Sequence, residues 1–180
     1  MAKEPNKSGG GAQTNKNGLH FEQTTSLAKY LEEAGYKISN FEVFDKAGKK
    51  IGLCVPKHDF YRLFLVKNSI DFKEYNSKKW LPDEAFVNFD RKTVYIIEKK
   101  FQSEPGSVDE KLPNCEFKRQ EYEKLCNPIP YDVKYYYILS DWFKKDVYRD
   151  TLQYVTSKGS LYFFHGQEKE FLEAIGLDIQ

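Results

Sequence analysis

The pattern of apolar and polar positions predicts one helix near the start of the chain, followed by several strands. Apolar residues recur at helical spacing over about 19–34, where Leu27, Tyr30 and Leu31 share one face and Gly35 is a typical helix stop. Short strand-like runs come next, and the turn at 45–48 separates the first two of them. The strands expected in this region are 36–44, 50–55 and 59–66.

The second half of the chain gives a clearer pattern. The runs 85–89 and 93–100 are strand-like, and Asp90-Arg91-Lys92 between them predicts a hairpin. The elements expected after this hairpin are a helix at 116–126, a strand at 133–139, a helix at 146–157, a strand at 160–164 and a helix at 167–175. Because a helix links strand 93–100 to strand 133–139, these two strands should be parallel neighbours. The expected fold class is therefore α/β, with a central mixed β-sheet flanked by helices.

Composition divides the chain into two parts and leaves the class of partner open. Residues 1–17 are rich in Gly, Asn and Lys, so we expect a flexible N-terminal arm before a single domain at 18–180. The net charge of +1 neither indicates nor excludes a nucleic acid partner. Three isolated cysteines, no membrane-length apolar run and no apolar signal segment predict a cytoplasmic protein.

Charged residues collect at one end of the predicted hairpin. Side chains alternate along a strand, so Glu98, Lys100 and Gln102 should share one face. If the turn centres on Arg91-Lys92, facing residues have numbers that add up to about 183, which places Asp83 opposite Lys100. Two carboxylates beside one ammonium group suit a bound magnesium ion, which prefers oxygen ligands. Such a centre can hydrolyse a phosphodiester. The alternative is a cross-strand salt bridge on an exposed sheet face.

The order Pro82-Asp83, fourteen further residues and Glu98-Lys99-Lys100 resembles the PD-(D/E)xK nuclease motif. Three other stretches are similar to type II restriction endonucleases of that superfamily. They are the segment 18–22, which resembles the opening helix, the run 96–112, and the run 135–143. The resemblance covers roughly 15–180 and is strongest between Pro82 and Leu112.

The resemblance implies a role for each residue of the site. Asp83 and Glu98 would bind Mg²⁺, and Lys100 would activate the attacking water. Glu22 would be an outer-shell group or a ligand of a second metal, and Gln102 an auxiliary group near the scissile phosphate. Glu84 is an alternative to Asp83, and Lys99 an alternative to Lys100. Alternation favours Lys100, because Lys99 points away from the face of Glu98.

The implied function is site-specific cleavage of double-stranded DNA by a homodimer, since two-fold dimers cut palindromic sites. Three basic residues are expected to bind DNA phosphates: Lys111, Lys118 and Arg119. A solvated helix face would explain Lys118 and Arg119 equally well. Two other functions stay open. One is a structure-specific or nicking nuclease on the same fold, and the other is a catalytically silent DNA-binding domain.

Overall fold

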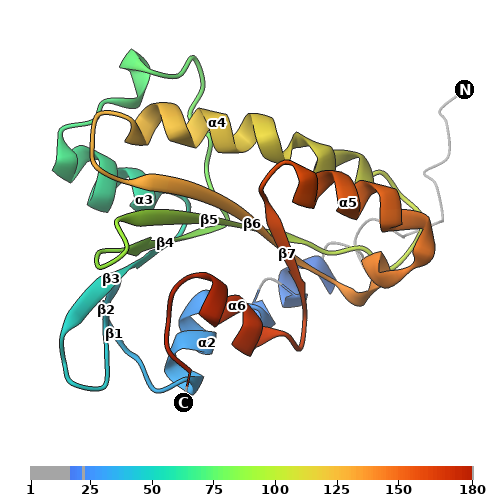
Figure 1. The fold of residues 1–180 in the computed structure, drawn as a ribbon, viewed down its shortest axis with the longest axis horizontal. Helices are drawn as coiled ribbons and strands as arrows, with labels where there is room; N and C mark the ends of the chain where they lie inside the picture. Colours follow the sequence, from blue (N-terminus) through green and yellow to red (C-terminus); the bar gives the residue numbers. More distant parts are fainter. Residues whose placement is uncertain (1–16, 22, 180) are drawn as a thin grey trace, which may run out of the picture.

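The computed structural model describes residues 17–21 and 23–179, and these form an α/β fold around one mixed β-sheet. The seven strands lie in the sheet in the order of the chain (Figure 1). Neighbouring strands are antiparallel from β1 to β5, whereas β5, β6 and β7 run parallel. The strands are β1 (Lys37–Ser39), β2 (Glu42–Phe44), β3 (Lys50–Val55), β4 (Glu84–Asn88), β5 (Thr93–Lys100), β6 (Asp132–Leu139) and β7 (Leu161–Phe164). The predicted fold class is confirmed, and so is the parallel pairing of β5 with β6.

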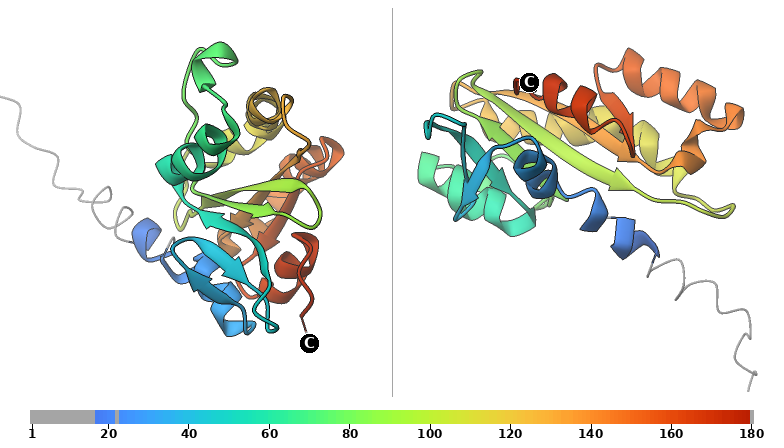
Figure 2. Two further views of the ribbon diagram at one scale, coloured as in Figure 1. Left: turned by 90° about the vertical axis from the view of Figure 1, so that its left-hand side faces the viewer. Right: turned by 90° about the horizontal axis from the view of Figure 1, so that it is seen from below.

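Helices cover both faces of the sheet. The helices α3 (Lys57–Phe60), α4 (Cys115–Cys126) and α5 (Arg149–Ser157) lie on one face, and α2 (Leu27–Glu33) and α6 (Glu168–Ala174) lie on the other (Figures 1 and 2). Short helical segments complete the chain: η1 (Tyr61–Leu65), η2 (Val66–Asn68), η3 (Phe72–Glu74), η4 (Asp109–Asn114), η5 (Asp141–Lys144) and η6 (Asp146–Tyr148). The faces are called the α4 face and the α2 face below.

The central strand β5 is buried on both sides, which explains its nearly continuous apolar sequence. Val94 and Ile96 pack into the core of the α4 face, whereas Tyr95 and Ile97 pack into the core of the α2 face. The same alternation continues to the end of the strand. It directs Glu98 and Lys100 toward the α4 face and Lys99 toward the α2 face.

The predicted strand at 59–66 is wrong. This segment is helical and runs through α3, η1 and η2. Its buried residues Phe60, Tyr61, Phe64 and Leu65 have the spacing of one helix face, while Arg62 between them is exposed. The high density of apolar residues concealed a helical period.

Two other boundaries differ from those predicted. The helix expected at 19–34 is interrupted at Thr25 and Ser26, and α2 starts only at Leu27. The strand expected at 36–44 is a hairpin of β1 and β2, because Asn40 and Phe41 take positive φ angles of 48° and 69°. The turn at 45–48 forms as predicted, with Gly48 at φ 81°.

The register of the β4–β5 hairpin also differs from the prediction. Glu84 pairs with Ile97 and Asn88 with Thr93, so a loop of residues 89–92 joins the strands. Asp83 therefore lies next to Glu98 rather than opposite Lys100, and Ala85 pairs with Ile96 rather than Glu98. The error is two residues. Because side chains repeat every two residues, it leaves each residue on the predicted face.

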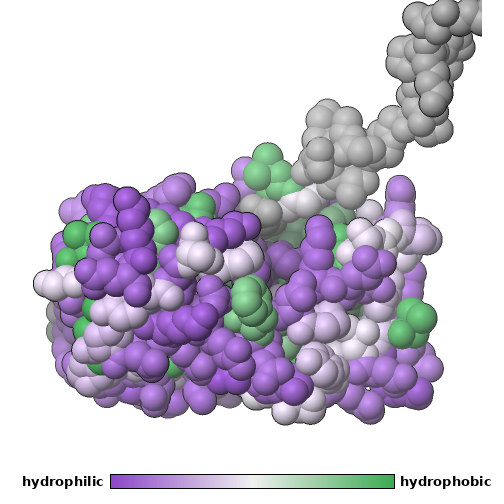
Figure 3. Space-filling view, turned by 90° about the horizontal axis from the view of Figure 1, so that it is seen from above, coloured by the Kyte–Doolittle hydropathy of each residue, from purple (hydrophilic) through white to green (hydrophobic). Residues whose placement is uncertain are grey.

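The remaining properties concern the surface and the thiols. The surface that carries α4 and α5 is mostly hydrophilic, with apolar residues in separate patches (Figure 3). Cys54, Cys115 and Cys126 are buried and free. No helix in the described part of the chain has the length and apolar character needed to cross a membrane. Of the predicted arm, residues 1–16 lie outside the described residues.

Candidate active site

Charged residues gather where β4 begins and β5 ends, and they divide between the two faces of the sheet. Asp83, Glu98 and Lys100 belong to the α4 face, and Glu84 and Lys99 belong to the α2 face. The sequence alternatives to Asp83 and Lys100 thus form a separate ion pair. This division follows from the alternation of side chains along paired strands.

On the α4 face, one ammonium group contacts both carboxylates. The Lys100 Nζ lies 2.8 Å from Glu98 Oε2 and 4.0 Å from Asp83 Oδ2. Asp83 Oδ2 also accepts a 2.8 Å hydrogen bond from the backbone N–H of Lys99, which fixes the carboxylate against the end of β5. The side chains of Asp83 and Lys100 are 25% and 20% exposed, whereas that of Glu98 is 6% exposed. The cluster is therefore partly open to solvent, and Glu98 is its most buried member.

A second lysine reaches Glu98 from the helix above the strand. The Lys118 Nζ on α4 lies 3.6 Å from Glu98 Oε1, so each oxygen of this buried carboxylate has its own ammonium neighbour. Sequence reasoning assigned Lys118 to a row of phosphate contacts along the helix. The structure brings its side chain to the candidate active site, and its predicted contact with a DNA phosphate stays a prediction.

Trp80 anchors this second lysine. Its ring lies 4.9 Å from the Lys118 Nζ and packs edge-on against Phe117, and Lys78 lies over the same ring at 4.3 Å. The indole N–H donates a 3.1 Å hydrogen bond to Glu121 Oε2. No local pattern in the sequence connects Trp80 with the site.

Three tyrosines lie close enough to Glu98 for its charge to act on them. Burial raises the pKa of Tyr135, Tyr122 and Tyr137 far above the usual value, and the negative charge of Glu98 adds to the effect. These phenols therefore stay protonated. Their buried rings lower the polarity around Glu98, which strengthens the electrostatic interactions of its carboxylate.

The pair on the α2 face is closed by hydrogen bonds. Lys99 Nζ lies 2.7 Å from Glu84 Oε2, with side chains only 4% and 13% exposed. The backbone N–H of Leu27, at the start of α2, donates to both Glu84 oxygens at 3.2 and 3.1 Å. Burial raises the pKa of Glu84, and Lys99 opposes that shift. This pair ties α2 to the sheet.

Gln102 holds a loop beside the site. Its side-chain N–H groups donate to the carbonyl oxygens of Glu104 and Gly106 at 2.8 and 3.4 Å. Its backbone N–H and C=O both bond the hydroxyl of Ser140, at the end of β6. The strand ends at Lys100, so alternation no longer governs Gln102. Its predicted role near the phosphate stays a prediction.

The remaining predicted residues lie apart from one another. Lys111 is exposed in η4, and Arg119 on α4 pairs with Glu123 and lines a groove that Lys118 does not line. Their predicted contacts with DNA are not tested by this arrangement. Glu22 lies outside the described residues.

The donor set suits a hard cation. Among the residues that the structure describes, no group of three or more His, Cys, Asp or Glu residues could hold a metal. Magnesium, however, commonly uses one or two protein carboxylates and completes its shell with water and substrate phosphate. Asp83 and Glu98 provide two such carboxylates beside each other, and the site has an open side. These residues therefore fit a magnesium ion that is completed by its substrate.

Comparisons with known proteins add little to this geometry. No family model and no curated protein matches the chain. Among solved structures, an XisH family protein from Nostoc punctiforme PCC 73102 is similar with 15% identity and a TM-score of 0.39, over 82% of this chain and 93% of that chain. A likeness of this size carries no argument about activity. The function is therefore inferred from the site.

Proposed function

We propose that the chain is a magnesium-dependent endonuclease that cleaves double-stranded DNA at specific sites. The observation that carries the proposal is the contact of Lys100 with both Asp83 and Glu98 at the end of the central strand. The resemblance of the segment 82–112 to type II restriction endonucleases supports the same activity.

Asp83 and Glu98 would hold the metal, which supplies charge neutralisation at the phosphate and lowers the pKa of water. The backbone N–H of Lys99 keeps the Asp83 carboxylate in place for this task. Lys100 lies beside both carboxylates, where its ammonium group can orient the attacking water and donate a hydrogen bond to a phosphate oxygen. Lys118, next to Glu98, would add a second positive charge near a bound phosphate.

Substrate recognition is assigned to surfaces around this centre. Lys78 and Lys118 lie over the Trp80 ring, and Lys118 also reaches Glu98. Lys111 is exposed in the segment that follows the loop held by Gln102. Basic side chains at these positions would follow the phosphates of a duplex. Cleavage of both strands at a palindromic site would use two copies of the chain, one for each strand.

The test is cleavage of unmethylated phage DNA by the purified protein, with and without magnesium, beside an Asp83→Asn variant. Discrete fragments that require magnesium and disappear in the variant would support the proposal. Cleavage only of branched or nicked substrates would replace it with a structure-specific nuclease. Binding without cleavage on every substrate would indicate a silent DNA-binding domain.

A further inference from the structure

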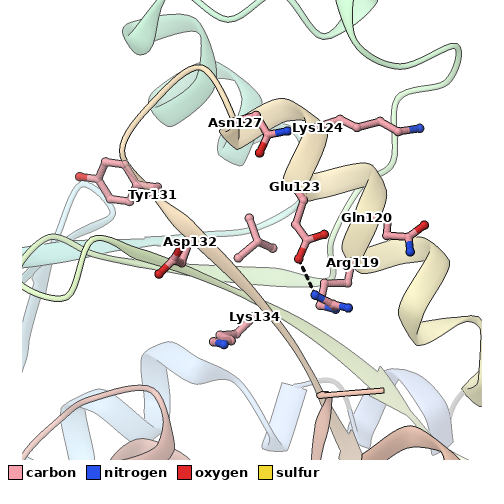
Figure 4. Close-up of a pocket in the computed structure, with 9 residues that line it drawn as sticks. Arg119, Gln120, Glu123, Lys124, Asn127, Tyr131, Asp132 and Lys134 are labelled. Atoms are coloured by element: carbon pink, nitrogen blue, oxygen red, sulfur yellow. Dashed lines mark hydrogen bonds and ion pairs between the residues drawn. The ribbon is translucent and has the colours of Figure 1, made fainter. Parts of the chain in front are cut away.

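The first half of β6 has a neighbour on one side only. β5 pairs with β6 from Asp132 to Leu139, but β7 pairs only with Tyr136–Leu139. No other strand of the described sheet lies beside residues 132–135. A groove of about 530 Å³ is open there between β6 and α4 (Figure 4). The first half of β6 is therefore an unpaired strand edge, although β7 pairs with the second half.

The hydrogen bonds at the two ends of β6 show which backbone groups face this groove. The N–H of Asp132 donates to Lys92 and that of Ser140 to Lys100, so even-numbered residues of this segment direct their backbone groups toward β5. The carbonyl of Leu139 accepts from His165 after β7, so odd-numbered residues direct theirs away from β5. Val133 therefore presents its backbone N–H and C=O groups to the open edge.

The side chains around Val133 carry a self-complementary charge pattern. Asp132 and Lys134 are both exposed and lie on the same face of the strand, because they are two residues apart. If a second copy of the strand runs antiparallel with Val133 opposite Val133, each Asp132 lies opposite a Lys134 of the partner subunit. In that register the two valines form a hydrogen-bonded pair, which is what the direction of their backbone groups requires.

We propose that this edge binds a second copy of the chain, by antiparallel pairing of β6 around Val133. An exposed lysine on an edge strand ordinarily discourages pairing with other strands. Here each lysine would meet an aspartate, and opposite charges across a strand pair stabilise it. A strand without this charge pattern would leave Lys134 unpaired, so the edge should bind a second copy of β6 in preference to other strands. The inference does not depend on nuclease activity.

The test uses charge reversal in the full chain and sedimentation velocity over a range of concentrations. Asp132→Lys and Lys134→Asp should each weaken dimerisation by at least about tenfold, because each creates two like-charge pairs. An equimolar mixture of the two variants should dimerise again, since the charges become opposite across the interface. A Lys169→Glu variant on α6 is the control and should dimerise like the wild type.

Restoration by mixing is the decisive result, because a misfolded variant could not produce it. A wild type that stays monomeric at every concentration would overturn the proposal. Lys134 would then serve to discourage strand pairing at this edge. Dimers that tolerate both single changes, or a mixture that stays monomeric, would also overturn it. Cleavage of DNA is not measured here, so failure of this proposal leaves the nuclease proposal untouched.

Discussion

The two faces of the sheet at the end of β5 both carry acidic residues and lysines, but these differ in their exposure to solvent. On the α2 face, Glu84 and Lys99 form one ion pair that is nearly sealed from solvent and hydrogen-bonded to α2. On the α4 face, Asp83, Glu98 and Lys100 form a looser cluster with a solvent-exposed side. Consecutive residues of two strands thus belong to two sites with different environments.

The difference shows how chemistry is separated from stability in so small a space. The closed pair is nearly sealed from solvent, and both Glu84 oxygens already accept hydrogen bonds. The open cluster holds Glu98 between two ammonium groups, and both of these can move toward an incoming phosphate. Residue type alone therefore does not decide whether a charged group is sealed in an ion pair or open to a ligand. The helix packed on each face differs, because α2 donates a backbone N–H to the closed pair whereas α4 adds the Lys118 side chain to the open cluster.

The largest expected effect is on cleavage. Lys100→Met should lower the single-turnover cleavage rate by about 100- to 10,000-fold, because it removes the group that we propose orients the attacking water. The fold should be retained, since Lys100 is partly exposed. Magnesium-dependent cleavage of plasmid DNA measures the effect, with Lys169→Met as the control. Unchanged cleavage would place the active site elsewhere.

Breaking the closed pair should affect stability rather than chemistry. Lys99→Met leaves Glu84 buried without its cation, so the free energy of unfolding should fall by about 3–5 kcal/mol. The double change Glu84→Gln with Lys99→Met should cost less, because no charge stays buried alone. Urea denaturation followed by circular dichroism compares the two. A single variant as stable as the double one would contradict this assignment.

A smaller effect is expected for the second lysine of the site. Lys118→Met should tighten magnesium binding roughly fivefold, about 1 kcal/mol, because one of the two cations competing for Glu98 is removed. Lys118→Arg should bind magnesium like the wild type. Calorimetric titration without DNA measures the affinity. Weaker binding in Lys118→Met would show that this lysine does not compete with the metal.

The smallest effect concerns pH. Burial raises the folded-state pKa of Glu84 above its ordinary value of 4.5, so its ionisation is less favourable in the folded chain. Its contribution to stability is therefore complete below pH 4.5 and falls as the pH rises through the raised pKa. The difference in unfolding free energy between wild type and Glu84→Gln should decline over this range. A difference that grows with pH would reverse the assigned direction.

Much of the fold could be predicted because local patterns were strong. Most of β5 and the second half of β6 are apolar on both faces, and Asp90-Arg91-Lys92 marked the turn before β5. The helix at 57–68 was mistaken for a strand because its apolar residues crowd together, although their spacing is helical. The hairpin register was two residues off, because the turn residues do not determine the length of the loop.

The site could be predicted only as far as adjacent strands define it. Asp83, Glu98 and Lys100 lie together because their positions in a hairpin bring them together. Lys118 and Trp80 join them only through the packing of α4 over the sheet, which no short-range pattern encodes. The bond between Gln102 and Ser140 likewise depends on where β5 and β6 end.

The three buried thiols can report separately on local opening of the two layers of this fold. Burial raises the pKa of Cys126 to about 12 and that of Cys54 beyond its usual range, so both are unreactive toward alkylating reagents in the closed protein. Cys54 lies in the core under α2 and α6, whereas Cys115 and Cys126 lie at the two ends of α4. The labelling rate of Cys54 would therefore report local opening of the core under α2 and α6. The labelling rates of Cys115 and Cys126 would report local opening around α4.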